Sequence, residues 1–144
     1  MPPPHRRPLG RRLLLGSAGG LAGAAAPRPT RAHALVTASD PAAGAALAAP
    51  PERVTVRFNS RIDHARSRLS LIGPGAAGAP PVVLAPLPPG DPTVLEAPCP
   101  PGLVPWAPGA WRLRWQVLAV DGHITRGDIP FVLRPAPAAD GVAR

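Results

Sequence analysis

The feature that most constrains this chain is a series of short apolar segments separated by proline and glycine. The chain has 144 residues, of which 24 are proline and 15 are glycine. Residues 53–58 (RVTVRF) and 111–120 (WRLRWQVLAV) alternate between apolar and polar positions, which is typical of strands with one buried face. No segment after residue 33 repeats apolar residues at helical spacing. The pattern therefore predicts an all-β protein.

Seven short strands are expected in about a hundred residues, which fits a β-sandwich or barrel. Besides the two alternating segments, the candidates are a strand that starts at residues 35–37 and stops at 40–41, three strands at 69–72, 82–84 and 93–95, and a final strand that includes residues 129, 131 and 133. Trp111 and Trp115 share one face and are expected in the core, because each buries a large apolar area. Pro130 predicts an edge position or a bulge in the last strand. Residues 42–51 are expected to form a loop of small residues.

The first 32 residues predict a cleavable export signal. Arg11 and Arg12 precede the apolar run 13–15 and a stretch rich in glycine and alanine, which resembles a twin-arginine signal. Ordinary secretion is one alternative, and a disordered basic tail is another. The run is too short to span a bilayer, which takes roughly 20 apolar residues.

The charge of the chain is concentrated in this leader. The formal net charge is +8, but it falls to +2 from residue 33 onward, where ten arginines face eight acidic residues. That balance argues against a nucleic-acid partner. No later segment predicts stable membrane insertion of the mature chain. The expected organisation is an export signal at 1–32, a single β domain at 33–135 and a flexible tail at 136–144.

The cleavage site decides what the mature chain begins with. A cut after Ala32 would make His33 the first residue, whereas a cut after Ala34 would remove it. Both sites place small residues at the positions that signal peptidases prefer. The sequence leaves the two alternatives open.

The residues Asp121-Gly122-His123, which follow the longest alternating segment, suggest a metal site. The mature part has no recognisable nucleophile motif, phosphate-binding glycine loop or cysteine pair. Cu(II) prefers tetragonal nitrogen and oxygen ligands. A terminal His33 would offer an amine and an imidazole, and Asp121 and His123 would add an oxygen and a third nitrogen. The alternative is a plain Asp-Gly hairpin turn.

Three further residues carry weaker signals. Cys99 is the only cysteine and stands among prolines, so an incidental loop thiol is expected, with a role as metal ligand as the alternative. His64 is expected to be a solvated loop residue. Asp63 and His64 could instead join a metal site.

The sequence resembles the CopC family of periplasmic copper-binding proteins from residue 33 to about 134. The segments HALV at 33–36 and SDPA at 39–42 resemble the opening of that family. The similarity is strongest where APG at 107–109, WRLRW at 111–115, VDGH at 120–123 and FV at 131–132 follow in the same order and spacing. This combination is more specific than Asp-Gly-His alone, and it favours a metal site over a mere turn.

The resemblance implies a Greek-key, immunoglobulin-like sandwich or barrel that binds one Cu(II) ion through His33, Asp121 and His123. Some relatives supply an acidic residue after the phenylalanine that ends the second strand, but Ser60 stands at that position here. Some relatives carry a methionine-rich Cu(I) site. The only methionine here is Met1, so no thioether site for soft Cu(I) is expected.

We therefore expect a secreted or periplasmic copper carrier, buffer or delivery protein in copper resistance or uptake, and not an enzyme. An inner-membrane copper transporter is the partner that the family implies. One alternative is a copper-dependent oxidative enzyme with a histidine brace. Such enzymes present a broad substrate face, whereas Trp106 is the only aromatic residue expected in a loop here. The other is a metal-free β-sandwich interaction module. Copper binding should fail at low pH, because protons compete for the nitrogen ligands.

Overall fold

The computed structural model describes residues 33–75 and 78–136, and in these residues the protein is all-β. They form the strands β1 (Val36–Asp40), β2 (Ala45–Leu47), β3 (Arg53–Phe58), β4 (Ile62–Ile72), β5 (Val82–Leu84), β6 (Val94–Pro98), β7 (Gly109–Ala119) and β8 (Ile124–Leu133). Within the described ranges, no helix has the length and apolar character needed to cross a membrane. The predicted export signal and nearly all of the predicted tail lie outside the described residues.

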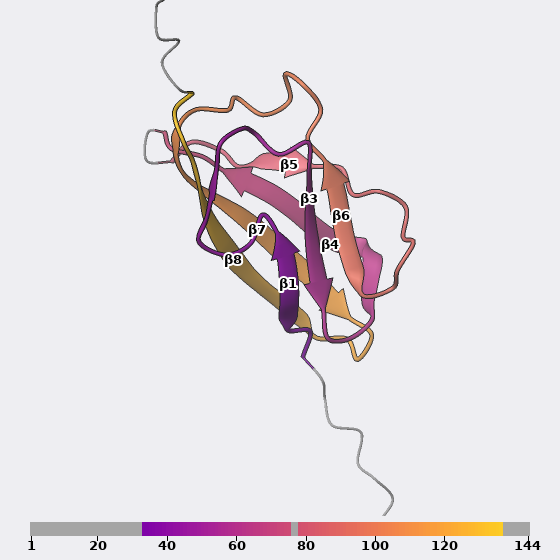
Figure 1. Cartoon of the computed structure of the whole chain (residues 1–144). Helices are drawn as coiled ribbons and strands as arrows, with labels where there is room; N and C mark the ends of the chain where they lie inside the picture. Colours follow the sequence, from indigo (N-terminus) through magenta and orange to yellow (C-terminus); the bar gives the residue numbers. More distant parts are fainter. Residues whose placement is uncertain (1–32, 76–77, 137–144) are drawn as a thin grey trace, which may run out of the picture.

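The strands form two packed sheets (Figure 1). The smaller sheet has the order β1-β3-β6, and the larger has the order β2-β8-β7-β4-β5. Strand β2 runs parallel to β8, and the other neighbours are antiparallel. Sequence neighbours such as β3 and β4 lie in different sheets, so the chain crosses repeatedly between the layers. The predicted all-β sandwich is confirmed.

The core lies between the sheets, on the faces that the alternation predicts. Alternate residues of β3, β7 and β8 are buried: Val54, Val56, Phe58, Trp111, Leu113, Trp115, Val117, Ile129, Phe131 and Leu133. Phe58 and Trp115 meet edge to face across the two layers, with ring centroids 5.3 Å apart. Burying one such side chain contributes about 1.5–3 kcal/mol. The position expected for the tryptophans is therefore confirmed.

The number of strands and the start of β4 differ from the prediction. Residues 45–47 were expected in a loop but form β2, an eighth strand that is held by pairing with residues 131–133 of β8 rather than by its own propensity. Strand β4 begins at Ile62 and not at Leu69, because an irregularity between Asp63 and Arg68 interrupts its alternation. A pattern search of period two does not detect a strand across such a bulge.

Pro130 lies inside β8 without breaking the sheet. It is opposite Arg112 of β7, and its carbonyl accepts a hydrogen bond from Gly44 N–H at 2.7 Å on the other side of the strand. The pairing with β2 starts only at Phe131. Strand β8 lies between β2 and β7 and pairs with β7 without a register shift, so the predicted edge position or bulge was wrong. The proline is tolerated because its nitrogen faces the side of β8 where the ladder with β2 has not yet started.

Three segments meet at one end of the sandwich, the lower end in Figure 1. They are the start of β1, the β3–β4 loop at 59–61 and the β7–β8 turn at 120–123. The register requires this arrangement, since Val36 is opposite Phe58 and Ile62 is opposite Ala119. The fold therefore brings the first described residues to the Asp-Gly-His turn.

Candidate metal site

The turn between β7 and β8 has a defined hydrogen-bonded form. Gly122 N–H donates to the Ala119 carbonyl at 2.9 Å, and Ala119 N–H donates to the His123 carbonyl at 2.9 Å. Gly122 has φ +86°, a left-handed conformation that glycine adopts without steric cost. The Asp-Gly pair thus forms the hairpin turn that it predicts. That turn also positions the two neighbouring polar side chains.

Asp121 and His123 contact each other across the turn. The His123 backbone N–H donates to Asp121 Oδ1 at 3.0 Å. The other carboxylate oxygen, Oδ2, lies 3.2 Å from His123 Nδ1. That ring nitrogen is shielded from water and has no hydrogen-bond partner. An unpartnered imidazole nitrogen next to a carboxylate oxygen is a donor pair suited to a metal ion.

His33 lies against His123, although 90 residues separate them in the sequence. Their ring centroids are 5.3 Å apart, and the rings are nearly perpendicular at 87°. His33 itself is exposed, at the start of the described chain. Two imidazoles and one carboxylate are therefore gathered at one end of the sandwich.

The segment after His33 is anchored on both sides. Ala34 is only 1% exposed, and its carbonyl accepts a hydrogen bond from Thr125 Oγ1 at 3.2 Å. Leu35 N–H donates to Asn59 Oδ1 at 2.8 Å, and Asn59 N–H donates to the Leu35 carbonyl at 2.9 Å. No sequence pattern marks Asn59 and Thr125 as positioning residues, because their partners are distant in the chain.

The electrostatics of the turn favour an ionised carboxylate. The hydrogen bond from the His123 backbone N–H lowers the pKa of Asp121, and the nearby charges of His123 and His33 lower it further. Asp121 therefore offers a negatively charged oxygen at neutral pH.

The three candidate side chains form contacting pairs rather than a complete cage. Among the described residues, no group of three His, Cys, Asp or Glu side chains is arranged to hold a metal ion. The separation of 3.2 Å between His123 Nδ1 and Asp121 Oδ2 is close to the spacing of adjacent ligands in a square array, about 2.9 Å for bonds of about 2.0–2.1 Å. A set suited to Cu(II) thus requires a further donor, such as an amine at His33.

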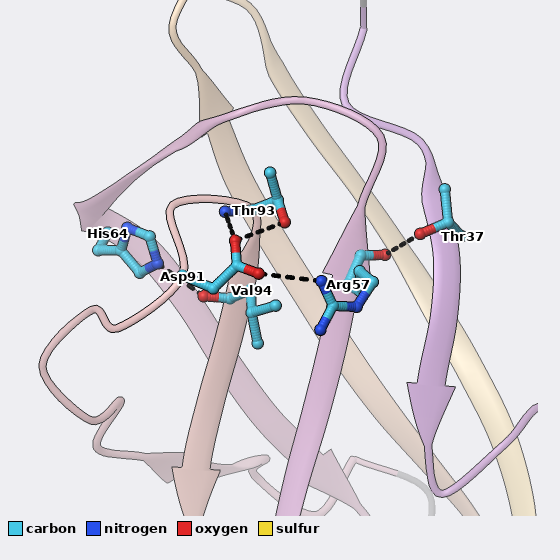
Figure 2. Close-up of polar contacts among 6 residues, drawn as sticks. All are labelled: Thr37, Arg57, His64, Asp91, Thr93 and Val94. Carbon is cyan, nitrogen blue, oxygen red and sulfur yellow. Dashed lines mark hydrogen bonds and ion pairs between the residues drawn. The ribbon is translucent and has the colours of Figure 1, made fainter.

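His64 does not lie in a loop, and that expectation was wrong. It is in β4, half-buried, and its Nε2 lies 2.6 Å from the Val94 carbonyl of β6, as Figure 2 shows. This contact links the two sheets. Asp63 is engaged by the Arg66 backbone N–H at 3.2 Å. These contacts give both residues structural partners, and the structure does not join them to the His33–His123 pair.

Close to His64 and Val94, Asp91 connects the β5–β6 loop to strand β3 of the smaller sheet. Asp91 accepts hydrogen bonds from Thr93 N–H at 2.8 Å, Thr93 Oγ1 at 2.7 Å and Arg57 at 3.0 Å (Figure 2). The Thr93 backbone bond, the Thr93 hydroxyl and Arg57 together lower the pKa of Asp91. This cluster is structural.

Cys99 follows β6 in a proline-rich loop, as the sequence predicts, but it is buried and its N–H donates to the Glu52 carbonyl at 2.8 Å. Burial raises the pKa of its thiol, which disfavours the thiolate that a metal would need. Ser60 lies in the β3–β4 loop at the candidate site's end of the sandwich, and its hydroxyl oxygen is buried without a hydrogen-bond partner. It offers no carboxylate there.

Comparisons with known proteins agree with this architecture. The model of the CopC domain matches residues 36–134. Protein YobA of Escherichia coli strain K12 is 30% identical over 107 residues, which cover 72% of this chain and 80% of YobA. The crystal structure of CopC from Methylosinus trichosporium OB3b has a TM-score of 0.62 at 27% identity, covering 73% of this chain and 97% of that one. PcoC, a methionine-rich copper resistance protein from Escherichia coli, has a TM-score of 0.56 at 27% identity, covering 72% of this chain and 100% of PcoC. This chain therefore belongs to the CopC family.

Proposed function

We propose that this protein is exported and binds one Cu(II) ion, which it carries, buffers or delivers in copper resistance or uptake. Membership of the CopC family supports this proposal. So does the similarity to PcoC, which is described as a copper resistance protein. The periplasm, or the outside of the cell, is the proposed location, and a membrane copper transporter is the proposed partner.

The observation that carries the proposal is the contact of His33 with His123 beside Asp121. The rings of the two histidines are 5.3 Å apart, and Asp121 Oδ2 lies 3.2 Å from His123 Nδ1. Imidazole nitrogens and a carboxylate oxygen are donors that Cu(II) accepts in tetragonal geometry.

The fourth donor in this proposal is the amine of a mature chain that starts at His33. Such an amine has an ordinary pKa of about 7.7–8.0, so it releases its proton readily to a competing metal. The anchoring of Ala34 and Leu35 would hold this terminus against the β7–β8 turn. A cut after Ala34 would remove both His33 and the Ala34 anchor.

The proposed site differs in kind from a methionine-rich one. The whole chain contains a single methionine, Met1. Soft Cu(I) prefers thioether and thiolate sulfur, whereas nitrogen and oxygen donors suit Cu(II). The proposal is therefore restricted to Cu(II).

The packing of the aromatic residues supports a binding role over glycan oxidation. The chain has three tryptophans, two phenylalanines and no tyrosine. Four of the five aromatics are buried in the core, and Trp106 packs half-buried against Trp111, with ring centroids 4.6 Å apart. No aromatic side chain is left to form an exposed platform for a sugar ring.

The test starts with the precursor expressed in an exporting host. Mass spectrometry of the exported protein determines the mature N-terminus, and a Cu(II) titration against a competing chelator measures the affinity. We expect a chain that begins at His33 and binds one equivalent of Cu(II). His33→Ala and His123→Ala should each weaken binding by at least about tenfold, as expected for the loss of a metal ligand or its partner.

The matched control is His64→Gln, which removes a histidine outside the site while an amide nitrogen can still donate to the Val94 carbonyl. Its Cu(II) affinity should equal that of the parent. A mature chain that begins at Leu35, or equal affinity in all three variants, would refute the proposal.

A further inference from the structure

The outer face of the larger sheet concentrates positive charge. Arg68 of β4, Arg112 and Arg114 of β7, and Arg126 of β8 are all exposed on strand positions that point away from the core. The register places Arg68, Gln116 and Arg126 in one transverse row across three adjacent strands. Neighbouring strands lie about 4.8 Å apart, and β7 separates β4 from β8. The backbones of Arg68 and Arg126 are therefore about 10 Å apart.

Acidic residues neutralise only part of this charge. Asp128 accepts bonds from Arg114 at 2.8 and 3.1 Å and from Arg112 at 3.3 Å. Within the described ranges, Arg68 and Arg126 have no ion pair. Asp63 also lies on this face, opposite Leu118, and forms an ion pair with the exposed Arg66 at 3.9 Å, which adds no net charge. The four arginines and Asp128 therefore leave this face with a net charge of +3.

The opposite face of the sandwich has no such excess. On the smaller sheet, Arg53 pairs with Glu96 at 2.7 Å and Arg57 pairs with Asp91 at 3.0 Å. Asp40 of β1 adds a further exposed acid opposite Thr55. The molecule therefore has one positive face and one that is neutral to acidic.

Exposed aliphatic side chains surround the arginines. Val83 of β5 is 65% exposed, Ile124 of β8 is 57% exposed and Val132 of β8 is 44% exposed. All three belong to the outer face, because Val83 is opposite Ser70, Ile124 is opposite Leu118, and Val132 is opposite Ala110. A positive centre between exposed aliphatic groups covers this face, which we call the arginine face.

We propose that the arginine face attaches the protein peripherally to an anionic phospholipid surface. Arginine binds phosphate oxygens through its planar fork of N–H donors. Aliphatic side chains at the same level can enter the boundary between headgroups and acyl chains. A nucleic acid or an acidic protein would satisfy the arginines but offers no continuous apolar layer for the three aliphatic residues, so the lipid surface is the occupant that fits both.

The candidate metal site would remain accessible in this orientation. It lies at the end of the sandwich, in the β7–β8 turn, rather than on the arginine face. Ile124 directly follows His123, so that end would lie beside the bilayer. This inference does not depend on copper binding.

The test is co-sedimentation with vesicles of phosphatidylcholine, with and without phosphatidylglycerol. We expect binding only to the anionic vesicles, weakening as salt rises to about 0.15 M. Arg68→Gln combined with Arg126→Gln should lower the partition coefficient about 30-fold, which corresponds to about 1 kcal/mol for each arginine. These two arginines lack ion pairs, so the double variant should fold like the parent, and circular dichroism checks this.

The matched control is Arg53→Gln combined with Arg57→Gln, which removes the same charge from the opposite face and should leave the partition almost unchanged. Two further variants test each part of the face. Val83→Ser should weaken binding several-fold, and Asp128→Asn should strengthen it. All variants share one N-terminus, so any contribution of residues 1–32 cancels in these comparisons.

Three outcomes would overturn the inference. One is the absence of binding to anionic vesicles, and another is an equal loss in both double variants, which would mean that net charge alone governs binding. The third is tighter binding to polyglutamate or DNA than to vesicles, with no effect of Val83→Ser. A Cu(II) titration of the same variants reports separately on the proposed copper site.

Discussion

Replacing Asp121 by asparagine removes the negative charge of this side chain but keeps its hydrogen bond in the β7–β8 turn. Asp121 Oδ1 accepts the His123 backbone N–H at 3.0 Å, and an asparagine oxygen can accept the same bond. The substitution removes the negative charge of Oδ2, which lies 3.2 Å from His123 Nδ1. Asp121→Ala removes both the charge and the hydrogen bond. The two variants therefore differ by the turn contact alone.

The expected magnitudes follow from these contacts. Removing a carboxylate that binds a metal, or that orients a histidine ligand, weakens metal binding by about 10- to 100-fold, or about 1.4–2.7 kcal/mol. Asp121→Asn should show this loss, while its stability without metal changes little. Asp121→Ala should show at least the same loss. It should also lower the free energy of unfolding by about 0.5–1.5 kcal/mol, the usual contribution of one hydrogen bond.

Two measurements check this pair of variants. Competition with a chelator of known affinity gives the Cu(II) dissociation constants at neutral pH, and denaturant unfolding of the metal-free proteins gives their stabilities. If Asp121→Asn bound Cu(II) as tightly as the parent, the carboxylate would have no part in the site. If Asp121→Ala were as stable as Asp121→Asn, the bond to the His123 N–H would not stabilise the turn.

Three further predictions concern the fold. Gly127→Ala should lower the free energy of unfolding by about 1–3 kcal/mol, because the new Cβ would lie 2.8 Å from the buried Trp115 ring. Denaturant titration measures this change, and an unchanged unfolding midpoint would contradict the packing. The hydrogen bond from Arg114 holds the pKa of Asp128 below its usual value, so this carboxylate stabilises the fold above about pH 4 and the effect disappears at lower pH. Asp128→Asn should therefore be less stable than the parent at pH 7, by under about 1 kcal/mol, and the gap should close in acid unfolding curves. Cys99 should react with a thiol reagent much more slowly in the native protein than in denaturant, and equal rates would show that it is not buried.

The core of this protein was predictable because alternation is a local property. Val54, Val56 and Phe58 in β3 and the two tryptophans of β7 are buried where a period of two places them. The prediction failed where a strand depends on its partner. Residues 45–47 have no strong strand signal and become β2 only by pairing with β8. His64 was predicted in a loop because a bulge hides the first half of β4.

In the candidate site too, contacts between neighbouring residues were predictable and contacts between distant residues were not. Asp121, Gly122 and His123 are adjacent in the chain, so their turn could be predicted from the sequence, and the resemblance to the CopC family identified them as metal-ligand candidates. The resemblance also suggested His33. That His33 lies 5.3 Å from His123, with Asn59 and Thr125 holding the intervening segment, could not be derived from spacing. The copper site itself stays a prediction.

The sequence by itself determined the all-β fold class and the family. Both the alternation of apolar residues and the order of the C-terminal motifs can be read directly from the order of the amino acids. Only the tertiary structure decided which distant residues meet. Strand register and the packing of two sheets bring His33 to the β7–β8 turn, and they gather four arginines from three strands on one face. The physical reason is that local patterns select strands and turns, whereas contacts between distant residues depend on how the whole set of strands buries its apolar faces.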